Sequence, residues 1–172
     1  MSAKIIAISG MQGAGKSTVA AALAARLPRA AHICADTLHK MIVSGALWPE
    51  DRQMSDEGAL QLRLRLHNMC LLAKSFADAA FTAILDDIII GERAQHLREE
   101  MAATPYTLVM LTPSLESVKQ REAGRGTQLW EAWGWMDAEA SATEGVDEWV
   151  DSTALSIEAT VEGIINHMGL GQ

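Results

Sequence analysis

Residues 10–18 read Gly10-Met11-Gln12-Gly13-Ala14-Gly15-Lys16-Ser17-Thr18. The stretch fits the pattern G-x-x-x-x-G-K-[ST], in which a glycine-rich loop leads from a strand into a helix. Triphosphate oxygens reach consecutive backbone N–H groups best where side chains do not obstruct them, which favours glycine. The stretch therefore predicts a phosphate-binding P-loop, and we expect the nucleotide to be bound by Gly10, Gly13, Ala14, Gly15, Lys16, Ser17 and Thr18.

Two side chains of this loop have specific predicted tasks. Lys16 can reach the β- and γ-phosphates and is a candidate catalytic residue, while the Ser17 hydroxyl can ligate Mg²⁺. The flanking sequence provides the context that the motif requires. Residues 4–9 are apolar and predict a buried parallel strand, and residues 17–27 predict an alanine-rich helix that ends before Pro28. ATP and Mg²⁺ are the expected cofactors.

Strands and helices are predicted to alternate along the rest of the chain. The further strands are expected at residues 30–35, 81–85, 106–112 and 148–150, and the further helices at 37–44, 57–80, 92–102, 114–122 and 155–168. This alternation is typical of a parallel sheet covered on both faces. We expect an α/β P-loop NTPase fold with three α/β/α layers and five parallel strands, of the nucleoside- or adenylate-kinase kind. One domain is expected to span residues 1–172.

The composition limits the kinds of partner that the protein can be expected to bind. The chain has 172 residues and a formal net charge of −8, which argues against a broad nucleic-acid or anionic-membrane surface. No window approaches a transmembrane span, and the N-terminus lacks the features of a signal peptide. Cys34 and Cys70 stand apart in apolar surroundings and suggest free thiols in a reducing compartment. We expect a cytoplasmic protein with a small-molecule partner; both a monomer and a homo-oligomer fit.

Acidic residues follow two of the predicted strands. Asp36 comes after the second strand and the pair Asp86-Asp87 after the third, at the sheet edge where parallel α/β proteins bind ligands. A kinase needs one carboxylate to orient or deprotonate the acceptor hydroxyl and another to hold the Mg²⁺ shell. The alternatives are that Asp36 is the N-cap of the next helix and that Asp86-Asp87 is a solvated turn.

Residues 121–142 form a candidate mobile lid. Glycines follow Arg121 and flank Arg125. Arginines that close over the γ-phosphate neutralise charge in the transition state; alternatively, these cations complement a helix C-terminus. Trp130 and Trp133 are spaced to share one helix face, where they either pack the lid onto the body or form an aromatic wall for a planar substrate. Residues 44–53 predict a loop over a substrate.

The chain resembles the chloramphenicol phosphotransferase family of small P-loop kinases. The resemblance is carried by GAGKS at 13–17, ADTL at 35–38, ILDDI at 84–88 and REAGRG at 121–126. It implies ATP-dependent phosphorylation of a hydroxyl on a small molecule, with Asp36 as the base. It also implies that residues 150–153 lie beside the adenine. The chain departs from the family at Gln128, where the lid often carries a further basic residue.

The expected activity is therefore that of an ATP-dependent phosphotransferase with an alcohol group as acceptor. We expect Asp36, Lys16, Arg121 and Arg125 to be catalytic, and Ser17 with Asp86 or Asp87 to organise Mg²⁺. The acceptor is an antibiotic, which would make this a resistance enzyme, or a nucleoside or sugar metabolite. The main alternative is a regulatory switch that hydrolyses NTP. A nucleic-acid end kinase is disfavoured by the acidic balance.

Overall fold

The computed structural model describes residues 4–48, 54–124 and 134–170. The strands are β1 (Ile5–Gly10), β2 (Ala30–Cys34), β3 (Thr82–Asp86), β4 (Thr107–Leu111) and β5 (Glu148–Val150). The helices in these ranges are α1 (Lys16–Arg26), α2 (Ala35–His39), α3 (Asp56–Asp78), α4 (Glu92–Glu100), α5 (Leu115–Ala123), α7 (Trp135–Ser141) and α8 (Ile157–Met168). Each predicted strand is present within a residue or two of its expected bounds.

The strands form one parallel sheet in the order β2-β3-β1-β4-β5. The expected five-stranded parallel sheet is therefore confirmed. β1 is its central strand, with β3 on one side and β4 on the other. Because the glycine-rich loop follows β1 directly, the loop lies at the carboxyl edge of the sheet, between the segments that follow β3 and β4.

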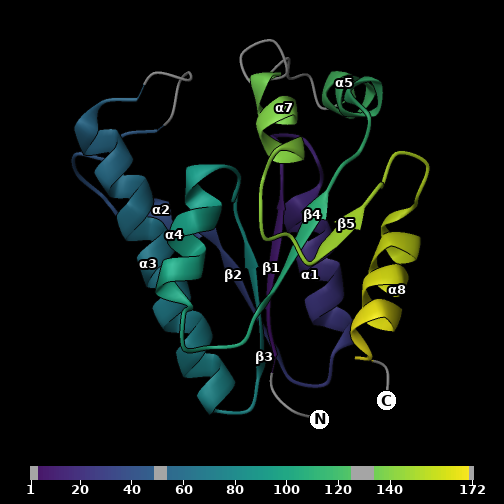
Figure 1. The fold of residues 1–172 in the computed structure, drawn as a ribbon, viewed down its shortest axis with the longest axis horizontal. Coiled ribbons are helices and arrows are strands. Elements are labelled where there is room, and N and C mark those ends of the chain that lie inside the picture. Colours follow the sequence, from purple (N-terminus) through teal and green to yellow (C-terminus); the bar gives the residue numbers. More distant parts are fainter. Residues whose placement is uncertain (1–3, 49–53, 125–133, 171–172) are drawn as a thin grey trace.

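Alternating side chains of β1 build two cores. Ile6 and Ile8 point into the core that is covered by α1 and α8, whereas Ile5 and Ala7 point into the core covered by α3 and α4. This follows from the period of two in a strand. Figure 1 shows α1 and α8 on one side of the sheet and α3 and α4 on the other. The predicted three-layer α/β/α arrangement is thus confirmed.

Helix α2 is shorter than the sequence predicts. The expected helix at 37–44 is found at Ala35–His39, so Asp36 lies inside its first turn rather than before it. Beyond the helix, Met41 is 70% exposed and Val43 is 96% exposed. Short helices are stabilised mainly by packing of an apolar face, and Met41 and Val43 bury little surface. The helix therefore ends early.

The two cysteines are free thiols. Cys34 is half-buried at the end of β2, and Cys70 is buried in α3. Burial raises the pKa of the Cys70 thiol to about 12. Since the thiolate is the reactive form, Cys70 is chemically inert at neutral pH. None of the described helices combines the length and the apolar character that a membrane span requires.

Candidate active site

The glycine-rich loop depends on backbone conformations that favour glycine. Gly10, Gly13 and Gly15 have φ angles of 148°, 81° and 93°. A Cβ on Gly10 would lie 2.7 Å from the carbonyl oxygen of Leu111 in the neighbouring strand, so a larger residue would collide with backbone. Gly10 and Ala14 are buried and shape the loop. The other predicted phosphate-binding residues line a cavity of about 380 Å³, namely Gly13, Gly15, Lys16, Ser17 and Thr18.

Lys16 is buried at the floor of this cavity, which we call the P-loop cavity. Its Nζ donates a hydrogen bond of 2.9 Å to the carbonyl of Met11, inside the loop. Burial lowers the pKa of Lys16 to about 8, while the carboxylates of Asp87, Asp86 and Asp36 act in the opposite direction. The ammonium is thus poorly solvated, and a phosphate anion would stabilise its charged form.

Asp86 faces the loop from the end of β3. Its Oδ1 accepts a hydrogen bond of 2.9 Å from the Ser17 hydroxyl, and its Oδ2 contacts Nε2 of His32. Asp87 points elsewhere: its Oδ1 accepts from Arg65 Nη2 at 2.6 Å and from the Ile88 N–H at 2.7 Å. Both carboxylates are buried, so the alternative of a solvated turn is wrong. Asp86 therefore faces Ser17 and Asp87 faces Arg65, a difference that the sequence does not reveal.

Ser9 holds this acidic segment in place. Its buried hydroxyl donates to the carbonyl of Ile89 and accepts from the Ile89 N–H, both at 2.9 Å. These bonds join the end of β1 to the residues that follow β3. The apolar run Ile88–Ile90 is thereby anchored to the central strand, which fixes the direction of the two aspartates before it.

Asp36 lines the same P-loop cavity and follows β2, the strand that pairs with β3. It is exposed, in the first turn of α2, and the N-cap of that helix is Cys34. The alternative that Asp36 is the N-cap is therefore wrong. Asp36, Asp86 and Lys16 all line one cavity, which agrees with the prediction that residues after the strand ends lie close together.

Two arginines that were not among the candidate site residues complete the P-loop cavity. Arg65 of α3 is buried, and its Nε has no hydrogen-bond partner among the described residues. Arg93 of α4 donates from Nη1 to the Ile88 carbonyl at 3.0 Å. Burial lowers the pKa of Arg93, whereas the Asp87 carboxylate raises it. A signal existed for Arg65: it falls on the apolar face of α3 with Leu62, Leu66 and Met69.

Arg121 reaches the P-loop from its other side. It lies in the last turn of α5, and its Nη2 donates to the Ser152 carbonyl at 2.8 Å. Its Nη1 would be 4.0 Å from a Cβ on Gly15, so the guanidinium lies over the loop. Arg125, Gln128, Trp130 and Trp133 fall outside the described residues. The predicted lid is thus described only at its two ends, α5 and α7.

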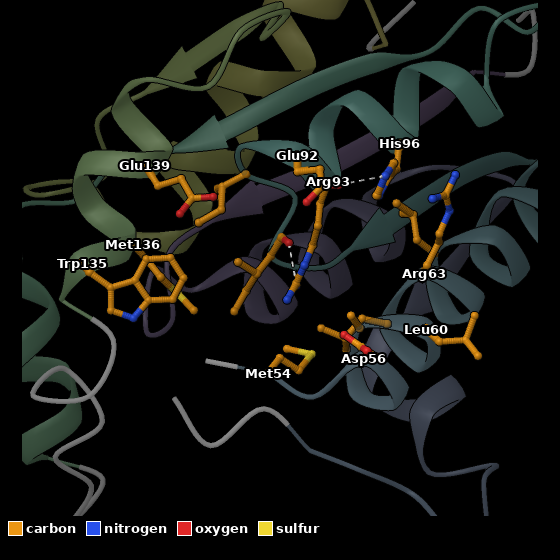
Figure 2. A pocket seen from close by; sticks show the side chains of 15 residues that line it. Met54, Asp56, Leu60, Arg63, Glu92, Arg93, His96, Trp135, Met136 and Glu139 are labelled. Carbon is orange, nitrogen blue, oxygen red and sulfur yellow. Dashed lines mark hydrogen bonds and ion pairs between the residues drawn. The ribbon is translucent and has the colours of Figure 1, made fainter. Parts of the chain in front are cut away.

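A second cavity of about 540 Å³ adjoins the P-loop cavity. We call it the side cavity; it lies among α3, α4 and α7. Figure 2 shows Arg93 between the α7 side chains Trp135, Met136 and Glu139 and the α3 side chain Arg63. Three residues line both cavities: Ile88, Arg93 and Met136. The side cavity combines an apolar wall with charged groups of both signs.

The donors at the loop fit a magnesium nucleotide. The Ser17 hydroxyl and the Asp86 carboxylate are hard oxygen ligands, and Mg²⁺ is commonly held by one or two such groups together with substrate phosphates and water. The glycine-rich turn and the buried Lys16 suit the phosphates themselves. The fold and these groups together define a small P-loop protein of the kinase-like class.

Comparison with known proteins places the chain more closely. A family model described as an AAA domain matches residues 5–142, and the chain belongs to this family. No curated protein matches the sequence. Among solved structures, the Deinococcus radiodurans tunicamycin resistance protein is similar with a TM-score of 0.73 and 21% identity, over 98% of this chain and 96% of that one.

Kinases of known structure share the fold. A sugar kinase from Janibacter sp. HTCC2649 matches with a TM-score of 0.70 and 19% identity, over 98% of this chain and 96% of its own. Shikimate kinase from Bacteroides thetaiotaomicron matches with a TM-score of 0.62 and 16% identity, over 97% and 99% of the two chains. The chain therefore has the fold of a small P-loop kinase.

Proposed function

We propose that this protein is an ATP-dependent phosphotransferase that transfers the γ-phosphoryl group to a hydroxyl of a small molecule, in the manner of the chloramphenicol phosphotransferase-like kinases. The observation that carries the proposal is the pair of adjoining cavities. The P-loop cavity has the groups that bind a nucleoside triphosphate, and the side cavity has room for a second small molecule. A hydrolytic switch needs only the first of them.

The two adjoining cavities provide a place for each reacting group. The acceptor would lie in the side cavity and extend its hydroxyl into the P-loop cavity, toward Asp36. As the bond from the acceptor oxygen to the γ-phosphorus forms, the bond from that phosphorus to the bridging β-oxygen breaks and ADP leaves. The hydroxyl proton passes to the Asp36 carboxylate. A carboxylate in this position assists the transfer as a general base.

The cations of the two cavities would balance the phosphate charge. Lys16 binds the β- and γ-phosphates from the floor, and Arg93 lies where the two cavities meet. Arg121 lies on the other side of the loop, and Arg125 keeps its predicted catalytic role. Mg²⁺, held by Ser17 and Asp86, would supply charge neutralisation on the phosphate oxygens. The use of ATP and the free thiols agree with a cytoplasmic site of action.

The acceptor is best sought among hydroxyl compounds of several classes. Antibiotics belong in the panel because of the resemblance to chloramphenicol phosphotransferases and because one structural neighbour is a tunicamycin resistance protein. Sugars belong because another neighbour is a sugar kinase. Nucleosides complete the panel. An enzyme that modifies an antibiotic would act in resistance.

The test measures ADP release from MgATP against this panel, with the product identified by mass. We expect one class of compound to accelerate ADP release and to gain one phosphoryl group. Lys16→Ala should abolish transfer with an unchanged unfolding midpoint. Lys74→Ala, whose side chain lies away from both cavities and donates to the Glu100 carbonyl, is the control. Hydrolysis at the same rate with every compound and with none would overturn the proposal in favour of the switch.

A further inference from the structure

One aromatic side chain of the P-loop cavity has no part in the proposed chemistry. Trp48 lines that cavity together with Lys16 and Asp36. Its ring meets His39 edge-on, with ring centroids 4.3 Å apart and an interplanar angle of 65°. The Trp48 residue is 44% exposed. A tryptophan buried for stability would be covered, whereas this one presents much of its surface to the solvent side.

The segment before Trp48 is held by two buried polar side chains. The Gln61 amide of α3 accepts from the Leu47 N–H and donates to the Gly45 carbonyl, both at 2.8 Å. His39 Nε2 contacts the Leu47 carbonyl at 3.0 Å and must donate, because a carbonyl only accepts. His39 and Gln61 are 1% and 7% exposed. Buried polar groups that bind one short segment rigidify it.

Apolar packing does not explain this arrangement. Met41, Val43 and Leu47 are all exposed, so the segment gains little by burial. The hydrogen bonds of His39 and Gln61 hold the backbone that leads to Trp48, and the His39 ring contacts the Trp48 ring. An exposed aromatic ring in a fixed position is a surface on which a flat ligand face can stack.

The position of Trp48 relative to the P-loop indicates which ligand it meets. α2 and α3 pack beside β2 and β3, on one side of the central strand. Arg121 and Ser152 lie on the other side, near the residues for which the resemblance implies a place beside the adenine. Trp48 shares its side with Asp36, the proposed base. The ring is thus placed for the acceptor and not for the nucleotide base.

We propose that Trp48, which lines the P-loop cavity, is the stacking surface for the part of the acceptor that enters this cavity from the side cavity, and that the acceptor carries its hydroxyl on or beside a flat ring. This inference rests on the proposed phosphotransferase function and specifies its substrate class. The ring is either aromatic or a sugar ring with an apolar face, since both stack on tryptophan. His39 and Gln61 are positioning residues that hold Trp48 beside Asp36.

The test uses the full chain loaded with Mg²⁺ and a non-hydrolysable ATP analogue. Binding of chloramphenicol, p-nitrophenyl glucoside, methyl glucoside and the acyclic polyol mannitol is measured by saturation-transfer NMR and titration. The variants are Trp48→Leu and Trp48→Phe. Trp149→Leu is the matched control, because Trp149 lies in β5 at the far edge of the sheet and is 45% exposed.

We expect ring-bearing compounds to bind the wild-type chain and to lose about tenfold in affinity in Trp48→Leu, as for a lost stacking contact. Trp48→Phe should stay within about threefold, because it keeps an aromatic face. Trp149→Leu should bind as the wild type does. The affinity for the ATP analogue should be the same in every variant. If only the nitrophenyl compounds lose affinity, the acceptor carries an aromatic ring. If methyl glucoside loses affinity as well, the acceptor carries a sugar ring.

Gln61→Met tests the positioning role. It should lower the affinity for the ring compounds and leave the affinity for the ATP analogue unchanged. Adding Trp48→Leu should cause little further loss of ring affinity, since both changes remove the same interaction. Full ring binding by Trp48→Leu, or a wild-type chain that binds none of the ring compounds, overturns the inference. The phosphotransferase proposal is judged separately by ADP release, so that mannitol-dependent turnover would preserve it while the role of Trp48 failed.

Discussion

Arg65 Nη2 and Asp87 Oδ1 lie 2.6 Å apart, and the two side chains are only 6% and 4% exposed. Removal of one partner from such a pair leaves an uncompensated buried charge. We expect Arg65→Met to lower the free energy of unfolding by about 3 kcal/mol, measured by urea denaturation. The double variant Arg65→Met/Asp87→Asn should lose less than the sum of the two single changes.

A matched control exists at the surface. Arg26 and Glu162 are also 2.6 Å apart but are 47% and 50% exposed. Arg26→Met should therefore lower the free energy of unfolding by less than about 1 kcal/mol. Equal effects of Arg26→Met and Arg65→Met would show that burial does not set the strength of the Arg65 pair.

The affinity for MgATP should fall as the pH rises through about 8. In the free protein, Lys16 loses its proton around a pKa of about 8, and the phosphates require the charged ammonium. Above that pH, binding must recapture a proton, so affinity falls by up to about tenfold per pH unit. Titration calorimetry from pH 7 to 9.5 measures this. Lys16→Arg, which stays charged, should bind with no such slope; the same slope in both proteins would remove Lys16 as its source.

Asp36→Asn should separate transfer from nucleotide binding. We expect kcat with the identified acceptor to fall by about 10² or more, because the amide cannot accept the proton. The affinity for MgATP should change by less than about twofold, since the uncharged amide has nearly the same shape. Asp78→Asn, at the exposed end of α3, is the control. Parallel loss of transfer and of MgATP affinity would assign Asp36 to the metal or to the fold instead.

Gly10→Ala should be more destabilising than Gly45→Ala. Both glycines have positive φ, at 148° and 77°, so both changes strain the backbone by about 1 kcal/mol. A Cβ on Gly10 would also lie 2.7 Å from the Leu111 carbonyl oxygen, whereas one on Gly45 meets nothing within 4 Å. We expect Gly10→Ala to cost more than about 2 kcal/mol. Equal unfolding midpoints would contradict the predicted contact with Leu111.

Much of the fold could be predicted from local patterns. The strand at Ile5–Gly10 and the helix from Lys16 follow from one motif, and the remaining alternation implies parallel strands with helices between them. The bounds of α2 could not be predicted, because its length depends on what Met41 and Val43 meet in three dimensions. Which side of α3 faces the core could not be predicted either: Leu60 and Leu64 are exposed, whereas Arg65 is buried.

The candidate site, too, could be predicted only where local sequence patterns determine it. One cavity is lined by Lys16, Ser17 and Asp36 because all three follow the ends of strands. Strand ends can be predicted from the sequence. The difference between Asp86 and Asp87 depends on which carboxylate faces Ser17 and which faces Arg65, and adjacent identical residues give no local signal for this. Trp48 and Arg93 reach the cavity through a loop contact and a helix orientation that only packing defines.

The order of the strands has a consequence for how such a protein can diversify. β2, α2, α3, β3 and α4 are consecutive in the chain and carry Asp36, Trp48, Arg65 and Arg93. The P-loop and α1 precede them, and β4, α5, β5 and α8 follow. A single continuous insert, joined at two points, would therefore move most of the acceptor half into a related kinase, together with Asp86 at the end of β3, while the P-loop and α1 would stay with the recipient. Only the α7 wall of the side cavity would remain from the recipient.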